Sequence, residues 1–85
     1  MTPAETLLEY DSALEGPDGR AYGARACGRL RDDGLWECWI ELESKDGEAV
    51  AVTSRESTQP NRTAAVYWAT GLSHVYLEGA LARAS

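Results

Sequence analysis

The fold is decided by residues 24–42, which read ARACGRLRDDGLWECWIEL. On both sides of Gly34 apolar and polar residues alternate, as they do in a strand with one buried face. The Asp-Gly pair between the two runs predicts a hairpin. A three-residue loop places Leu30 opposite Trp36, whereas a two-residue loop would set Leu30 against Glu37. We therefore expect the three-residue loop, with its glycine in the left-handed conformation.

Two further turns have the same chemistry, at Gly19 and Gly47, each preceded by an aspartate. Three-residue loops at these glycines also keep apolar residues opposite one another, for example Leu42 and Val50. Four antiparallel strands are therefore expected, over residues 6–15, 20–31, 35–44 and 48–55. The apolar face of this sheet is expected to carry Leu8, Tyr10, Leu14, Tyr22, Leu30, Trp36, Ile40, Leu42, Val50 and Val52. Leu8 is expected to lie opposite Gly28.

A helix is expected after the fourth strand, because residues 56–63 are polar and depart from the strand pattern. Pro60 suits the first turn of a helix, and Gly71 is a natural helix stop. The candidate N-caps are Ser57, Thr58 and Gln59. We expect a helix over residues 60–70, whose side with Trp68 and several alanines covers the apolar face of the sheet.

Residues 73–83 alternate again, which predicts a fifth strand. Its shared face would hold Val75, Leu77, Gly79 and Leu81. Because the helix returns the chain, this strand is expected beside the first, in the order 5-1-2-3-4. The sequence thus predicts one α+β domain over residues 1–85, mainly antiparallel β. Its element order resembles that of Src-homology-3-like barrels, and the sheet can curl into a small barrel of that kind, but no signature residue of that family is present and no function follows.

A second resemblance covers the C-terminal part of the chain. Residues 59–72 read QPNRTAAVYWATGL and residues 75–81 read VYLEGAL. These stretches are similar to a small bacterial family of uncharacterised proteins. The resemblance implies no activity.

The chain has 85 residues, with 8 Lys plus Arg and 14 Asp plus Glu, which gives a net charge of −6. Nucleic acids and membrane surfaces are anionic and are met by clustered Lys and Arg, so neither is an expected partner. The start of the chain lacks the pattern of a signal peptide, and no apolar run approaches the roughly 20 residues of a membrane span. We expect a cytoplasmic protein that uses no cofactor.

The charges are arranged in blocks that suit a ladder across the outer sheet face. The expected pairs are Arg29–Glu37, Arg25–Glu41, Asp11–Arg25 and Glu37–Arg55. Trp39 lies among these charges, and tryptophan is enriched where proteins meet partners. Two main interpretations stay open. Either arginine stems cover Trp39, or a protein-binding surface is formed by Trp39, Arg25, Arg29, Glu37 and Glu41. Nucleic acid would also suit an arginine-flanked aromatic, but the flanking acids oppose it.

A second candidate surface is the polar segment that follows the fourth strand. Its hydrogen-bonding side chains include Arg55, Thr58, Gln59, Asn61 and Arg62, and Tyr67 and Tyr76 are expected nearby. This segment either caps the helix and covers the sheet edge, or forms a recognition loop for a peptide or small polar ligand. The fourth strand would be an edge with little charge, and such edges pair with other chains unless covered. The edge is closed in a barrel, covered by residues 56–63, or used in a homodimer.

The two cysteines are expected to be free thiols, because the register places Cys27 outside and Cys38 inside the sheet. His74 is expected to be exposed, at the start of the last strand and away from both thiols. No nucleophile motif, phosphate loop or metal-ligand spacing is present. We therefore expect a non-catalytic module that binds another protein. The alternative is a domain that binds a small ligand, in the crevice between helix and sheet or at the loop of residues 55–62.

Overall fold

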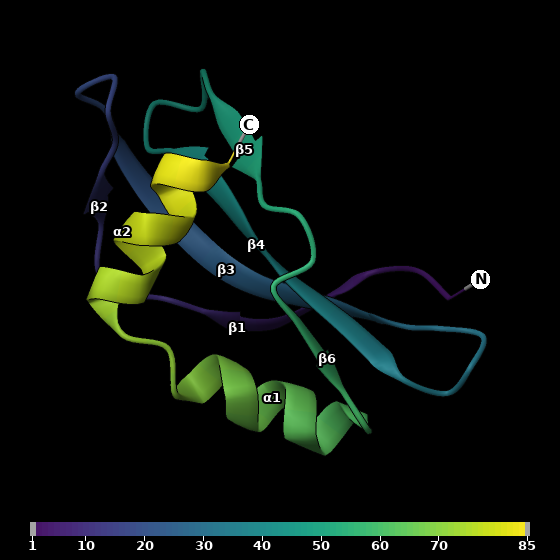
Figure 1. Ribbon diagram of the computed structural model, residues 1–85. Coiled ribbons are helices and arrows are strands. Elements are labelled where there is room, and N and C mark those ends of the chain that lie inside the picture. Colours follow the sequence, from purple (N-terminus) through teal and green to yellow (C-terminus); the bar gives the residue numbers. More distant parts are fainter. Residues whose placement is uncertain (1, 85) are drawn as a thin grey trace.

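The computed structural model describes residues 2–84 and shows a twisted antiparallel sheet with one helix crossing in front of it and a second helix below (Figure 1). The strands are β1 (Glu5–Glu9), β2 (Leu14–Glu15), β3 (Ala21–Leu30), β4 (Trp36–Ser44), β5 (Val50–Val52) and β6 (Ser57–Gln59). The helices are α1 (Arg62–Thr70) and α2 (His74–Arg83). The strand order is β1-β3-β4-β5, with β2 also beside β3 and β6 also beside β4. The α+β, mainly antiparallel prediction is confirmed, and over the described residues the sheet stays open instead of closing into a barrel.

The central hairpin has the predicted register along its whole length. β3 and β4 pair from Leu30 opposite Trp36 to Ala24 opposite Leu42 and beyond. All three turn glycines have φ between 76° and 86°, which is the left-handed region that favours glycine. These glycines are Gly19, Gly34 and Gly47. The turn chemistry read from the sequence is therefore confirmed.

The third hairpin differs from the prediction by one residue. Four residues, 45–48, separate the paired positions of β4 and β5, where three were expected. Val50 consequently lies opposite Glu43 instead of Leu42. Since a one-residue slip moves every side chain to the other face, Val50 and Val52 leave the predicted apolar face.

The predicted first strand is interrupted by residues 10–13, which separate β1 from β2. Leu8 lies opposite Ala26 instead of Gly28, an offset of two residues. Because the offset is even, Leu8 keeps the face that was predicted for it and packs against the core.

Tyr10 lies where the first strand is interrupted. Its hydroxyl donates a hydrogen bond of 2.6 Å to the carbonyl of Ala69 in α1, so the chain is tied to the helix at this point. Asp11, which follows, is exposed, and the predicted pair between Asp11 and Arg25 is wrong. Glu9 occupies the position opposite Arg25.

Residues 74–83 form α2, so the predicted fifth strand and its place beside the first strand are wrong. Ser73 begins the helix, since its hydroxyl accepts an N–H from the first turn at 3.1 Å. The buried residues of α2 are Leu77, Ala80 and Leu81. These recur at helical spacing, whereas Val75, assigned to the same strand face, is 75% exposed.

The predicted helix over residues 60–70 is confirmed, although it begins at Arg62. Its N-cap is Asn61, whose side-chain oxygen accepts the N–H of Ala64 at 2.8 Å. The three residues predicted as caps, 57–59, instead form β6 beside β4. Residues 56–63 therefore do not all leave the sheet.

The core lies between the sheet and the helices. Ala65 and Ala69 of α1 are fully buried and let the helix approach the strands, and Trp68 packs against the core as predicted. Leu30, assigned to the apolar face, is exposed near the end of its hairpin. No helix within residues 2–84 has the length and apolar character needed to cross a membrane.

Candidate interaction surface

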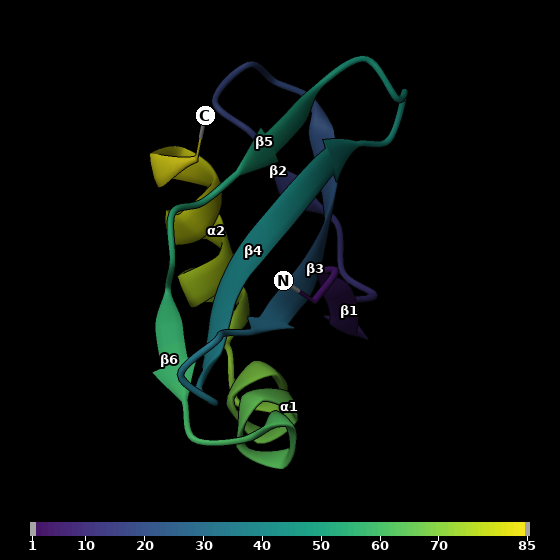
Figure 2. The same ribbon diagram turned by 90° about the vertical axis from the view of Figure 1, so that its right-hand side faces the viewer.

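One edge of the sheet is formed by β5 and β6, which follow one another along β4 (Figure 2). Within residues 2–84, β4 is the only strand that pairs with β5. The residues that flank β5, Ala49 and Thr53, both hydrogen-bond to the backbone of β4. Backbone groups of successive residues in an antiparallel strand point to alternate sides. The N–H and C=O groups of Val50 and Val52 therefore point away from β4, to the open edge.

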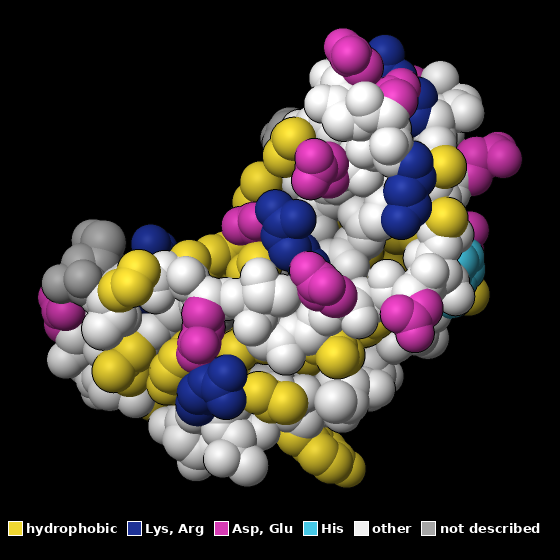
Figure 3. Space-filling model, turned by 180° about the vertical axis from the view of Figure 1, so that it is seen from behind, with side chains coloured by type: hydrophobic (Ala, Val, Ile, Leu, Met, Phe, Trp, Pro, Cys, Tyr) yellow, Lys and Arg dark blue, Asp and Glu magenta, His cyan; other side chains and the backbone are white. Residues whose placement is uncertain are grey.

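The side chains of the same two residues are also exposed. Val50 is 62% exposed and Val52 40% exposed, and they lie opposite Glu43 and Glu41 on the face that the helices leave free. Figure 3 shows this face, where hydrophobic side chains lie between acidic and basic ones. Free backbone groups and an apolar surface thus coincide on one short strand.

Ser44 accounts for the extra loop residue that turns the valines outward. Its hydroxyl accepts the N–H of Ala49 at 2.9 Å and donates to Asp46 Oδ1 at 2.6 Å. The equivalent positions of the other two turns are Gly16 and Arg31, which have no hydroxyl, and those loops have three residues. A serine two residues before Asp-Gly is therefore the sequence signal that identifies the longer loop.

The predicted charge ladder covers the outer face of β3 and β4. Arg25 donates to Glu41 Oε1 from Nε at 3.1 Å and from Nη2 at 2.9 Å, and Arg29 binds Glu37 in the same way. Trp39 lies between them, with Nε1 2.9 Å from Glu41 Oε2. The guanidinium of Arg29 stands 5.4 Å from the centre of the Trp39 rings. The structure thus brings together all five residues of this candidate surface.

The polar groups of the ladder hydrogen-bond to one another. Trp39 is half-buried, and both its N–H and one face of its rings are engaged. The hydrogen bonds from Trp39 and Arg25 lower the pKa of Glu41, so this carboxylate stays charged to a lower pH than an ordinary glutamate. This arrangement favours the interpretation in which Trp39 is covered by its neighbours, and it leaves Val50 and Val52 as exposed apolar groups beside the ladder.

Both cysteines are free, as predicted. Cys27 lies opposite Trp39 in the ladder and is buried, and burial, helped by the charge of Glu41, raises its pKa to about 11. Cys38 faces the core, and burial raises its pKa too. His74 is exposed as predicted, but it begins a helix instead of a strand. Over residues 2–84, no three side chains of His, Cys, Asp or Glu converge in a way that could hold a metal ion.

The residues predicted to form a recognition loop are divided between two elements. Thr58 and Gln59 belong to β6, where Thr58 lies opposite Glu37. Arg55 precedes the strand, is exposed and makes no ion pair within the part of the chain that the structure describes. The predicted pair between Arg55 and Glu37 is therefore wrong, because Thr58 and not Arg55 lies opposite Glu37.

Asn61 and Arg62 lie at the start of α1, where one caps the helix and the other joins it to β1. Asn61 caps the helix, and Arg62 Nε binds Glu5 Oε1 of β1 at 2.7 Å. An open groove of about 580 Å³ lies beside them, lined by Gln59, Asn61, Thr63, Ala64, Tyr67 and Trp68. Tyr67 is 80% exposed, so its ring is the most accessible aromatic surface of this groove. The predicted proximity of Tyr67 to the polar segment is confirmed.

Glu56 joins the strand edge to α2, a role that no sequence pattern indicated, although Tyr76 was expected near this segment. Its carboxylate, 11% exposed, accepts hydrogen bonds of 2.5 Å from the Tyr76 hydroxyl and from Arg83 Nη2. The Arg83 guanidinium also lies 5.7 Å from the Tyr76 ring. These partners lie 20 and 27 residues from Glu56 in the sequence, so only the fold brings them together. The connection between β5 and β6 is thereby attached to the helix side of the sheet.

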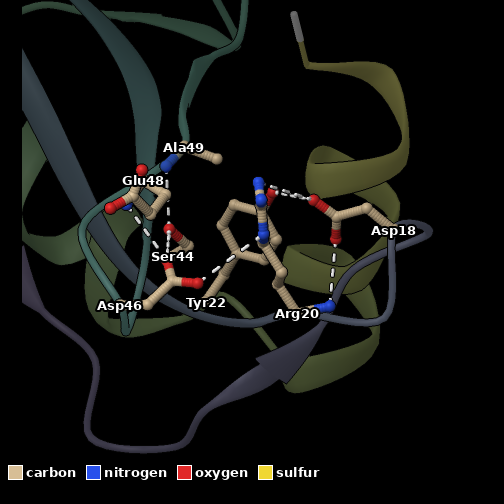
Figure 4. Close-up of polar contacts among 7 residues, drawn as sticks. All are labelled: Asp18, Arg20, Tyr22, Ser44, Asp46, Glu48 and Ala49. Carbon is tan, nitrogen blue, oxygen red and sulfur yellow. Dashed lines mark hydrogen bonds and ion pairs between the residues drawn. The ribbon is translucent and has the colours of Figure 1, made fainter.

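The tips of the first and third hairpins meet in a polar cluster (Figure 4). Arg20 lies between Asp18 and Asp46, at 3.6 Å from each carboxylate. The hydroxyl of Tyr22 donates to Asp18 Oδ2 at 2.7 Å, and this bond lowers the pKa of Asp18. The hydroxyl of Ser44 lowers the pKa of Asp46 in the same way. The acidic charge that the sequence concentrates at the turns is thus partly compensated, and the two hairpins are held together.

Comparisons of the chain with protein families, with curated proteins and with solved structures give no match. The resemblance of the C-terminal stretches to a bacterial family stays a prediction.

Proposed function

We propose that this protein is a non-catalytic interaction module that binds an extended segment of another protein along β5. The observation that supports the proposal is the coincidence, at Val50 and Val52, of outward-pointing backbone groups with exposed apolar side chains. An extended segment that adds to a sheet edge gains affinity from backbone hydrogen bonds and specificity from alternate side chains.

The surroundings of β5 support this use. Exposed apolar patches that are rimmed by polar groups mark interaction sites. The rim here is the charge ladder, in which Glu41 and Glu43 lie directly opposite the two valines. Arg25 binds Glu41 and lies 3.8 Å from Glu43, so the charge of the rim next to the valines is partly compensated. A partner segment with apolar residues at alternate positions fits this surface.

Selection of peptides displayed on phage tests the proposal. Random eight-residue peptides are selected for binding to the protein. The affinity of the selected peptides is then measured for the parent protein and for two variants. Val52→Pro removes an edge N–H that β4 does not use, and edge strands tolerate proline at such positions. Val52→Thr keeps the N–H and the branched shape. We expect Val52→Pro to weaken binding by about tenfold or more, and Val52→Thr by no more than about threefold.

The outcome that overturns the proposal is specific. Peptides that bind Val52→Pro as well as they bind the parent protein do not use this edge. The same conclusion follows if a selected peptide changes the amide chemical shifts of residues 59–68 and leaves those of residues 48–54 unchanged. Failure to select any peptide also counts against a module of this kind.

The groove beside α1 supports a second candidate function, the binding of a small polar ligand. Its lining combines the amides of Gln59 and Asn61 with the exposed ring of Tyr67. Pockets for small molecules pair apolar walls with a few polar groups in this way. Screening of a fragment library by amide chemical shifts tests it. Shifts at Gln59, Thr63 and Tyr67 are expected, and their absence across the library contradicts this function.

A further inference from the structure

We infer that the segment which pairs with β5 is the β5 strand of a second copy of this chain, so that two sheets join into one. This inference rests on the proposed function and names the partner at the same edge. Three properties of β5 support it: the direction of its backbone groups, the distribution of its side chains over the two faces, and the charges at its ends.

The backbone of β5 selects one antiparallel register. Only Val50 and Val52 direct N–H and C=O groups to the open edge, so both must be used for the largest number of hydrogen bonds. In an antiparallel pair this requires Val50 of one copy opposite Val52 of the other. The twofold axis then passes between the Ala51 residues of the two copies, and four backbone hydrogen bonds cross the interface. Such a contact is isologous and closed, as in most homodimers.

The side chains of β5 suit this register. On the outer face, Val50 and Val52 of both copies come together and remove from water the two exposed valines of each chain. On the inner face, Ala51 lies opposite its own counterpart. Its side chain is small and half-buried, so it adds little bulk to this face of the contact.

The charges at the two ends of β5 are opposite. Glu48 precedes the strand, and Arg55 follows it. Neither side chain makes an ion pair within residues 2–84. In this register Glu48 of each copy lies opposite Ser54 of the other, next to Arg55, so the acidic end of each strand meets the basic end of its partner, and this occurs twice. The net charge of −6 opposes association, so these two contacts are expected to matter for affinity.

The mass of the full chain in solution is the first test. A three-residue strand makes a small interface, so sedimentation equilibrium should run from about 5 µM to about 1 mM. We expect a reversible monomer–dimer equilibrium within this range. Val52→Pro should remain monomeric while keeping the fold, and Val52→Thr should still dimerise.

Charge reversal gives the matched test of register. Glu48→Arg and Arg55→Glu are both exposed changes, and each should raise the dimer dissociation constant by about tenfold. The double variant should regain the parent affinity. A mixture of the two single variants should form a heterodimer, because each then meets a partner of opposite charge at both contacts.

The outcomes separate this inference from the function on which it rests. A parent protein that is monomeric at about 1 mM overturns the homodimer. If selected peptides still lose affinity for Val52→Pro, the edge binds a different protein and the proposed function stands. A dimer that survives Val52→Pro, or that ignores the charge reversals, uses another surface and also overturns the inference.

Discussion

Ser44 lies at the turn whose extra residue directs Val50 and Val52 toward the solvent. The three turns share an aspartate whose carboxylate accepts the N–H two residues later, and a glycine with positive φ. They therefore look alike in the sequence. Only Ser44 adds a hydroxyl that accepts the N–H of Ala49, and this contact accompanies the one-residue slip. A pattern of apolar residues takes no account of this hydroxyl, so it was insufficient to predict the direction of Val50 and Val52.

Replacing this serine tests its role. Ser44 is 3% exposed, and Ser44→Ala leaves the N–H of Ala49 without its acceptor. We expect the free energy of unfolding to fall by about 1–2 kcal/mol in a denaturant titration. The pKa of Asp46 should also rise toward its ordinary value, since the Ser44 hydroxyl lowers it. Ser54→Ala, at an exposed serine, is the control and should change stability by less than about 0.5 kcal/mol. Equal stability of the two variants contradicts this account of the turn.

The Cys27 thiol is expected to react slowly. Burial raises its pKa from an ordinary 9.0 to about 11, so at pH 8 the thiolate fraction is about a hundredfold smaller than in an exposed cysteine. Because the thiolate is the reactive form, alkylation should accelerate as the pH rises toward 11. Iodoacetamide labelling followed by peptide mapping measures Cys27 separately from Cys38, in the native protein and in urea. A native rate equal to the rate in urea would show that the thiol is neither buried nor perturbed.

At the scale of elements, residues 73–83 show where sequence patterns fail. Leu77 and Leu81 are four residues apart, a spacing that fits one face of a strand and one side of a helix. The other buried residue, Ala80, fits only the helix. Ser73 as an N-cap was a further helical signal. By contrast, the central hairpin was predictable residue by residue, because one register alone satisfied both its apolar and its charged faces.

Two side-chain truncations distinguish the observed helix α2 from the strand that was predicted over residues 73–83. Leu77 is 4% exposed, and Leu77→Ala should lower the free energy of unfolding by about 2–4 kcal/mol. Val75→Ala should cost less than about 0.5 kcal/mol, because this side chain faces solvent. In the predicted strand both residues share the buried face and both changes would be costly. Chemical denaturation measures the difference, and comparable losses would contradict α2.

At the scale of the whole molecule, the sequence predicted features that depend on local patterns, but it did not predict the long-range contacts. The sequence was sufficient for the α+β class, the order of the central strands and the grouping of Trp39 with four charged residues, since these depend on neighbouring strands. It was insufficient for the contact of Tyr10 with Ala69 and for the attachment of Glu56 to α2. Those contacts join residues that the fold alone brings together. They fix the helices on one face, and the edge of β5 is left without a strand partner among residues 2–84.

The central claim, that β5 is an open edge available for pairing, is tested most directly by amide hydrogen exchange at two protein concentrations. In dilute protein, at about 50 µM, Val50 and Val52 should exchange freely, whereas Ala51 and Thr53 should be protected by β4. At about 1 mM the two valine amides should become protected while the other two stay unchanged. Protection of Val50 and Val52 in the dilute sample, or free exchange of Ala51 and Thr53, would contradict the account.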